Sequence, residues 1–202
     1  MKLVKELSDL KDKKVLLRTD FDVPVLGGKI TENFRIKKQK PMIVHLLNKG
    51  SAIVMVSHIS ALDSFEELVP QMENILGQKV SFIKDLGQLQ LLPSGNLFLL
   101  DNIRQWPGEK ENDDKFAEQL SQGFDLYINN DFAVSHRNHV SISAVTKFLP
   151  SYAGFILEDE VYQLQQAVNM PKDGKLIIIG GAKTESKVPV IKNFLNKKAE
   201  KI

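Results

Sequence analysis

Short apolar segments recur along the chain and are separated by polar or glycine-containing stretches. Within a segment the apolar residues are continuous rather than alternating, as in "SAIVMVSH" at residues 51–58. A continuous run of this kind is typical of a β-strand that is covered on both faces. The pattern predicts strands over residues 14–20, 51–58, 79–85, 96–102, 124–131 and 175–181.

The segments between these strands carry apolar residues at helical spacing. Ile43, Leu46 and Leu47 share one face of a predicted helix over residues 35–50, which Gly50 is placed to cap. Further helices are predicted over residues 64–77, 112–123 and 157–170. Because strands and helices alternate, the sequence predicts an α/β fold: a Rossmann-like, three-layer α/β/α domain with a mainly parallel sheet.

The polar stretch at residues 169–174 is the one plausible domain boundary. We expect residues 1–155 to form the main domain and residues 156–170, which Pro171 ends, to form a connecting helix. Residues 171–202 then hold one strand and one helix. A single βα unit cannot bury both of its faces, so it is expected to begin a second domain that is incomplete in this chain.

Composition limits the classes of function. The chain has 202 residues and a net charge of 27 − 25 = +2, which does not favour nucleic acid or a membrane surface as a partner. No apolar run reaches the roughly 18–20 residues needed to cross a bilayer, and the N-terminus has no signal-peptide core. The absence of cysteine excludes disulfides and makes the cytoplasm the expected compartment. Four histidines without cysteine argue against a structural zinc site, and no metal site is predicted.

Charged side chains follow the carboxyl ends of several predicted strands, which is where ligands bind in open α/β sheets. The basic ones come from separated segments: Arg18, Arg35, His58, Arg104, His136, Arg137 and His139. The acidic and amide ones are Asp20, Asp22, Asp101, Asn102, Asn129, Asn130 and Asp131. The planar guanidinium group matches carboxylates and phosphates in a bidentate manner. The sequence therefore predicts a site for a small, multiply charged anion.

Each arginine also has an ordinary structural interpretation. Arg18 can be an ion-pair partner of Asp20 or Asp22, and Arg104 can form a local salt bridge with Asp101. An arginine beside the start of a helix, as at position 35, can simply be solvated.

Two further patterns stay open. His136 and His139 are three residues apart, the spacing of a metal pair, but no third ligand is evident. The stretch "GGAKTESK" at residues 180–187 follows a predicted strand, and its glycines and helix N-terminus could hold a phosphate. Lys183 and Lys187 could equally be solvated lysines, since neither a P-loop nor a G-x-G-x-x-G fingerprint is present.

Longer motifs resemble those of phosphoglycerate kinases. "KVLLRTDFDVP" followed by "GKITENFRI" is similar to that family's opening motif. Four later motifs follow in the family's order: "DNIRQWPGEKEND", "YINNDFAVSHRNHVS", "KFLPSYAGFILEDEV" and "IIIGGAKTESKVPVI". The resemblance extends over nearly the whole chain.

The resemblance implies a function. In that family the N-terminal domain binds 3-phosphoglycerate or 1,3-bisphosphoglycerate, the C-terminal domain binds Mg²⁺ with ADP or ATP, and closure permits direct phosphoryl transfer. This chain is then expected to supply the phosphoglycerate side of a glycolytic kinase and to be inactive alone. A separate nucleotide-binding half is the implied partner, and no Mg²⁺-nucleotide is expected on this chain by itself. The alternative is a non-catalytic relative that binds an anion or a protein.

The resemblance also implies roles for individual residues. Arg35 would neutralise the transferring phosphoryl group, Lys183 would steady it, and Lys183 and Lys187 would contact the nucleotide. The implied substrate-binding residues are Asp20, Asp22, Arg35, His58, Arg104 and Arg137.

This sequence departs from the family pattern within the expected substrate site. The family's H-x-G-R-P reads "HISAL", so Ser60 and Ala61 stand where the pattern has glycine and arginine. Asp22 stands where the pattern has asparagine. In the later motif N-D-A-F-G, Asn130 stands where the pattern has aspartate, Asp131 where it has alanine and Ala133 where it has glycine. The pocket loses a positive charge at position 61 and gains a negative charge at position 22, so we expect 3-phosphoglycerate to bind weakly.

Overall fold

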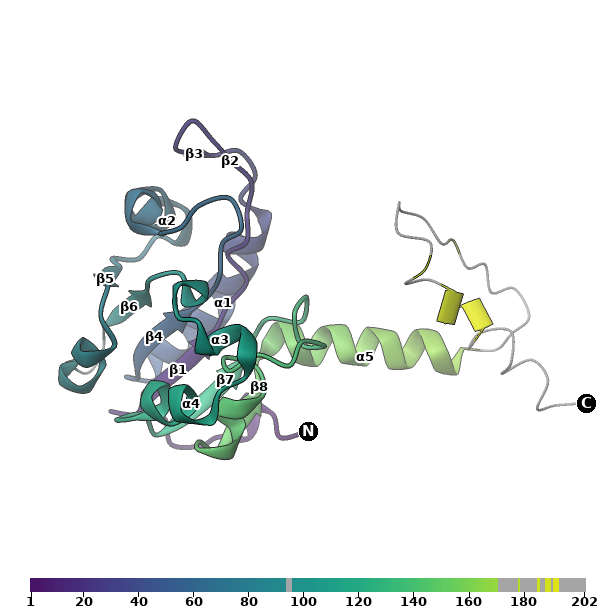
Figure 1. The fold of residues 1–202 in the computed structure, drawn as a ribbon. Helices are drawn as coiled ribbons and strands as arrows, with labels where there is room; N and C mark the ends of the chain where they lie inside the picture. Colours follow the sequence, from purple (N-terminus) through teal and green to yellow (C-terminus); the bar gives the residue numbers. More distant parts are fainter. Residues whose placement is uncertain (94–95, 171–177, 179–184, 186–187, 190, 193–202) are drawn as a thin grey trace, which may run out of the picture. The chain divides into compact units, whose positions relative to one another are not determined.

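The computed structural model describes residues 1–93 and 96–170, together with residues 178, 185, 188–189 and 191–192 (Figure 1). The predicted strand at 175–181, apart from residue 178, and the residues Lys183 and Lys187 lie outside the described residues. The chain divides into two compact units, Met1–Leu164 and Gln165–Ile202. The description below concerns the first unit.

A parallel sheet of six strands lies at the centre of this unit, in the order β5-β6-β4-β1-β7-β8. The strands are β1 (Lys14–Arg18), β4 (Ala52–Val56), β5 (Ser81–Ile83), β6 (Leu97–Leu100), β7 (Leu126–Asn129) and β8 (Ser151–Ala153). Five of them lie inside predicted strands, and the parallel α/β fold is confirmed. β8 was not predicted, and neither was the small antiparallel hairpin of β2 (Val25–Leu26) and β3 (Lys29–Ile30).

The helices follow the predicted order. The α-helices are α1 (Phe34–Asn48), α2 (Val69–Leu76), α3 (Gly108–Glu111), α4 (Asp114–Ser121) and α5 (Phe155–Asn169). Short 3₁₀ helices are η1 (Val4–Glu6), η2 (Glu66–Leu68), η3 (Leu86–Leu91), η4 (Ile103–Gln105) and η5 (Ala144–Lys147). Gly77 ends α2 in the left-handed conformation, with φ of 67°, and donates its N–H to Glu73. The four predicted helices correspond to α1, α2, α4 and α5 and are confirmed.

Hydrophobic cores cover both faces of the sheet. Successive side chains of a strand point to opposite faces, so in β1 Val15 and Leu17 enter one core and Leu16 enters the other. The first core receives side chains of α1 and α2, and the second receives side chains of α4 and η5. This arrangement confirms the three layers. Helices suited to crossing a membrane are absent from the described residues.

The position of β1 determines where the polar residues gather. β1 lies between β4 and β7, and its last residue, Arg18, is in register with Val56 and Asn129. The backbone ladder continues past the strands, because Thr19 donates to Val56 and Asn130 donates to Arg18, each at 2.9 Å. The residues that follow these three strands therefore emerge at the same edge of the sheet.

Candidate functional site

Arg18 lies beneath this edge and is almost completely buried, with 2% of its surface exposed. Its Nε donates to Ser141 Oγ at 3.0 Å, and its Nη1 forms an ion pair with Asp131 Oδ2 at 3.1 Å. Its Nη2 lies 3.0 Å from His58 Nδ1. The interpretation of Arg18 as a structural ion-pair partner is confirmed, because it pairs with a buried carboxylate. The predicted acidic partners, Asp20 and Asp22, are wrong: among the described residues the carboxylate that pairs with the buried guanidinium group is that of Asp131.

Asp131 is the buried counter-charge of Arg18. Its carboxyl group is inaccessible to solvent. Burial raises the pKa of Asp131 to about 6, against the lowering effect of Arg18, while the nearby charge of Asp20 raises it further. Backbone N–H groups of Ala133 and Val134 also favour the ionised form. At neutral pH the group is a carboxylate that balances the arginine.

A second acid, Glu109, balances the same arginine through Ser141. The Ser141 hydroxyl donates to Glu109 Oε1 at 2.6 Å, and the Ser141 backbone N–H donates to Oε2 at 2.9 Å. Burial raises the pKa of Glu109, against these hydrogen bonds. Tyr127 donates its hydroxyl to the Ser141 carbonyl at 2.7 Å. We call Arg18, Asp131, Ser141 and Glu109 the buried network.

His58 connects the buried network to the surface. Burial lowers the pKa of His58 to about 3, and the charges of Arg18, Arg104 and Arg137 lower it further, against the opposing effect of Asp22. The ring is therefore neutral at physiological pH. Its Nε2 lies 3.4 Å from Asp22 Oδ2.

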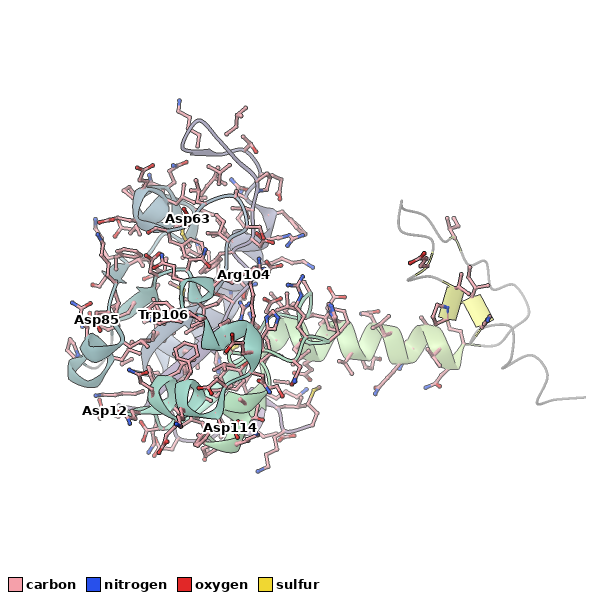
Figure 2. All side chains as sticks on the ribbon, viewed as in Figure 1. Asp12, Asp63, Asp85, Arg104, Trp106 and Asp114 are labelled. Carbon is pink, nitrogen blue, oxygen red and sulfur yellow. The ribbon has the colours of Figure 1, made fainter. Side chains whose placement is uncertain are left out.

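Asp22 closes a half-exposed cluster at the rim of the site. Its Oδ1 accepts the Ser60 N–H at 2.7 Å, and its Oδ2 accepts the Ser60 hydroxyl at 3.2 Å. Ser60 Oγ in turn accepts from Arg104 Nη1 at 2.9 Å. Arg104 is labelled in Figure 2. We call Asp22, Ser60 and Arg104 the rim cluster.

A salt bridge between Arg104 and Asp101, one of the two interpretations of Arg104, is absent from the described residues. Asp101 instead accepts from the Ser64 hydroxyl at 2.9 Å, the Phe65 N–H at 2.9 Å and Gln105 Nε2 at 2.8 Å. Its carboxylate is therefore engaged in holding the loop after β4. The guanidinium group of Arg104 remains at the rim.

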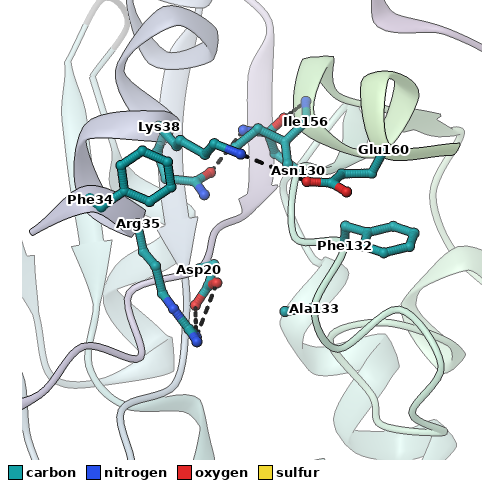
Figure 3. A pocket seen from close by; sticks show the side chains of 10 residues that line it. Asp20, Phe34, Arg35, Lys38, Asn130, Phe132, Ala133, Ile156 and Glu160 are labelled. Atoms are coloured by element: carbon teal, nitrogen blue, oxygen red, sulfur yellow. Dashed lines mark hydrogen bonds and ion pairs between the residues drawn. The ribbon is translucent and has the colours of Figure 1, made fainter. Parts of the chain in front are cut away.

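Arg35 occupies a different part of the same edge. It lies in the first turn of α1, and its Nη1 is 3.3 Å from both carboxylate oxygens of Asp20. The pair lines a cavity of about 240 Å³, and Figure 3 shows Phe132 and Ala133 on its opposite side. Arg35 is 47% exposed, so this ion pair is open to solvent.

Asn130 also lines this cavity. Its Nδ2 donates to Gln39 Oε1 at 2.8 Å, and its Oδ1 accepts the Ile156 N–H at 3.0 Å (Figure 3). Gly154 packs against this amide so closely that a Cβ at position 154 would clash with the Asn130 side chain. Asn130 therefore joins α1, β7 and the start of α5.

The predicted substrate residues thus fall into two groups. His58, Asp22 and Arg104 lie together, and Arg137 is near enough for its charge to lower the pKa of both His58 and Arg104. Arg35 and Asp20 form the second group. The buried network lies between the two groups: Arg18 contacts His58 of the first group, and the charge of Asp20 in the second group raises the pKa of Asp131.

Some predicted or possible site residues do not join either group. Lys183 and Lys187 lie outside the described residues. His139 Nδ1 lies 3.8 Å from Glu109 Oε1, and burial lowers the pKa of His139. The described residues contain no group of three or more His, Asp or Glu side chains that could hold a metal ion.

Comparison with known proteins gives the family. The family profile described as "Phosphoglycerate kinase" matches residues 4–202. This chain belongs to the phosphoglycerate kinase family. It is 40% identical over 204 residues to the phosphoglycerate kinase of Wolbachia sp. subsp. Drosophila simulans (strain wRi), covering 95% of this chain and 51% of that protein. It is 36% identical over 203 residues to that of Bartonella bacilliformis (strain ATCC 35685 / KC583 / Herrer 020/F12,63), covering 94% and 51%.

Solved phosphoglycerate kinase structures have the same fold. The crystal structure of phosphoglycerate kinase from Pyrococcus horikoshii OT3 superposes with a TM-score of 0.89 at 27% identity, over 98% of this chain and 53% of that one. The enzyme structure from Coxiella burnetii gives a TM-score of 0.86 at 27% identity, over 96% and 52%. The chain therefore spans about half the length of the phosphoglycerate kinases it matches.

Proposed function

We propose that this chain forms the phosphoglycerate-binding side of a phosphoglycerate kinase, which transfers a phosphoryl group reversibly between 1,3-bisphosphoglycerate and ADP. The observation that carries the proposal is that His58 and Arg104 meet at the Asp22–Ser60 pair at the carboxyl edge of the sheet, with Arg137 near enough for its charge to lower the pKa of both. Three groups that favour anions thus approach one another from three separate segments. The family membership supports this assignment of the ligand.

The side chains would act by position and charge. Arg104 and Arg137 would hold the anionic groups of the ligand, and the neutral His58 would donate from Nε2. Arg35 would then meet the phosphoryl group in transfer, where a fixed positive charge stabilises the transition state. This role requires Arg35 to leave Asp20, and the solvent-exposed pair can separate at little cost.

Magnesium and the nucleotide would be held elsewhere in the protein. In the family they supply the phosphoryl acceptor and neutralise its charge. The residues assigned to the nucleotide by resemblance, Lys183 and Lys187, lie outside the described residues. The described residues therefore account for the phosphoglycerate side alone, and we expect no turnover without a nucleotide-binding half.

A second candidate is a non-catalytic member of the family. Asp22 favours this candidate, because its carboxylate already accepts the hydrogen bonds of Ser60 and lies beside His58 and Arg104. An internal carboxylate in this position competes with an anionic ligand for the same donors. Such a protein would retain the fold and bind phosphoglycerate weakly.

One experiment separates the two candidates. The chain is mixed with the nucleotide-binding half of a phosphoglycerate kinase, and ATP-dependent turnover of 3-phosphoglycerate is measured in a coupled assay. The kinase function predicts turnover that Arg104→Met abolishes and that the exposed control Lys115→Met leaves unchanged. Binding of 3-phosphoglycerate by calorimetry without turnover would favour the non-catalytic candidate. Absence of both at millimolar ligand would contradict the proposed site.

A further inference from the structure

The hydrogen-bond directions in the buried network are fixed by chemistry. A guanidinium group can only donate, so Arg18 Nη2 donates to His58 Nδ1 and Arg18 Nε donates to Ser141 Oγ. The Ser141 hydroxyl, having accepted one hydrogen bond, directs its own proton to Glu109 Oε1 at 2.6 Å. Each partner in the chain from Glu109 to His58 therefore has one assigned role.

This chain determines the protonation of the His58 ring. Because Nδ1 accepts from Arg18, the single proton of the neutral ring must be on Nε2. That nitrogen points to Asp22 Oδ2, 3.4 Å away, and hence to the rim cluster. We propose that Glu109 and Ser141 are positioning residues that, through Arg18, hold His58 as the neutral tautomer with its proton on Nε2.

Ser141 is well suited to this task because of its surroundings. It is 1% exposed, its backbone N–H is bound by the second oxygen of Glu109, and its carbonyl accepts from Tyr127. A residue anchored at three atoms keeps its hydroxyl in a fixed place. Asp131 holds the other end of the Arg18 guanidinium group at 3.1 Å, so the fork cannot rotate away from His58.

The role of His58 in ligand binding, described next, rests on the proposed function. His58 would offer an N–H donor to the phosphoglycerate anion without carrying a charge. The charged groups around the ring come from every neighbouring segment: Arg18 at the end of β1, Asp22 after β1, Arg104 in η4 and Arg137 after β7. Because three of these four are cationic, protonation of the ring is opposed over the physiological range, and the donor stays the same between pH 5 and pH 8.

The experiment that tests the proposal is ¹⁵N NMR of the histidine rings in the intact chain. In the unaltered protein the His58 Nδ1 signal should be that of an unprotonated nitrogen and the Nε2 signal that of a protonated one, unchanged from pH 5 to pH 8. A proton on Nδ1, or an imidazolium ring at pH 6, would overturn the proposal. This measurement needs no variant.

A variant tests the roles of the positioning residues. Ser141→Ala removes the acceptor of Arg18 Nε, so the two His58 nitrogen signals should converge as the tautomers mix. Ser143→Ala, a matched change two residues away, should leave them unchanged. Unaltered His58 signals in Ser141→Ala would refute the role of Ser141.

Ligand binding gives a separate readout. The loss of one well-oriented hydrogen bond should weaken 3-phosphoglycerate binding by about three- to tenfold in Ser141→Ala. If the unaltered chain binds no 3-phosphoglycerate, the proposed function fails, while the ring signals still decide the proposal on the tautomer.

Discussion

The buried network and the rim cluster both place carboxylates beside cationic groups at the edge of the sheet, but they differ in their exposure to solvent. Arg18 and Asp131 are 2% and 0% exposed, whereas Asp22 keeps 27% of its side chain exposed. A buried charge that loses its partner cannot be rescued by water, but a charge at the rim can. The comparison teaches that the buried acids are part of the fold, while the rim acid is replaceable by a ligand.

The largest effect should come from removing the buried cation. Arg18→Met leaves Asp131 without its counter-charge and Ser141 without its donor, so the free energy of unfolding should fall by about 3–5 kcal/mol at pH 7. Urea denaturation followed by circular dichroism measures it. A loss below about 1 kcal/mol would show that the buried network does not differ from a surface ion pair.

The next effect concerns ligand binding at the rim. Asp22→Asn with Ala61→Arg removes a negative charge and adds a positive one, each worth about 1.5–3 kcal/mol beside an anion. The affinity for 3-phosphoglycerate should rise by roughly two to four orders of magnitude. Calorimetry tests this, with Asp63→Asn as an exposed acidic control in the same loop. An unchanged dissociation constant would place positions 22 and 61 outside the site.

The pH dependence of stability should separate His58 from Asp131. The pKa of His58 is lowered to about 3, so its stabilising contribution is complete above pH 6.5 and is lost as the pH falls. The pKa of Asp131 is raised to about 6, so proton uptake there favours the folded state over the acid range. The two contributions have opposite signs.

His58→Asn should therefore lose less stability than the unaltered chain between pH 6 and pH 4, by up to about 1.4 kcal/mol per pH unit. Urea unfolding at several pH values measures the difference, and His136→Asn serves as an exposed control. Parallel pH profiles for His58→Asn and the unaltered chain would contradict the neutral assignment of the buried ring.

The smallest effect is expected at the exposed ion pair. Arg35→Met should change the free energy of unfolding by less than about 1 kcal/mol, because solvent screens its contact with Asp20. The same variant should abolish turnover in the two-half assay. A loss of stability comparable to that of Arg18→Met would remove the distinction between the two kinds of pair.

Most of the fold follows from local patterns in the sequence. Five strands were predictable because their residues are apolar without interruption, and four helices because of their spacing and caps. β8 was missed because only Ser151, Tyr152 and Ala153 form it, between Pro150 and Gly154. Three residues without an apolar run carry no strand signal, and β8 exists because β7 offers a free edge.

The site was predictable in part, and for a different reason. Strand ends and family motifs pointed to His58, Arg104 and Arg137, and the structure brings them together. The buried network was missed because Glu109 and Ser141 are 32 residues apart and share no pattern. The signal that existed was chemical: Asp131 lies two residues beyond the end of β7 and stands where the family pattern has alanine.

The close packing of Gly154 against Asn130 has a consequence for how this protein can diverge. Any larger residue at position 154 would displace the amide that ties Gln39 to the first turn of α5. A change of charge at the solvent-exposed edge of the sheet therefore disturbs the packing less than the addition of a single carbon atom at position 154.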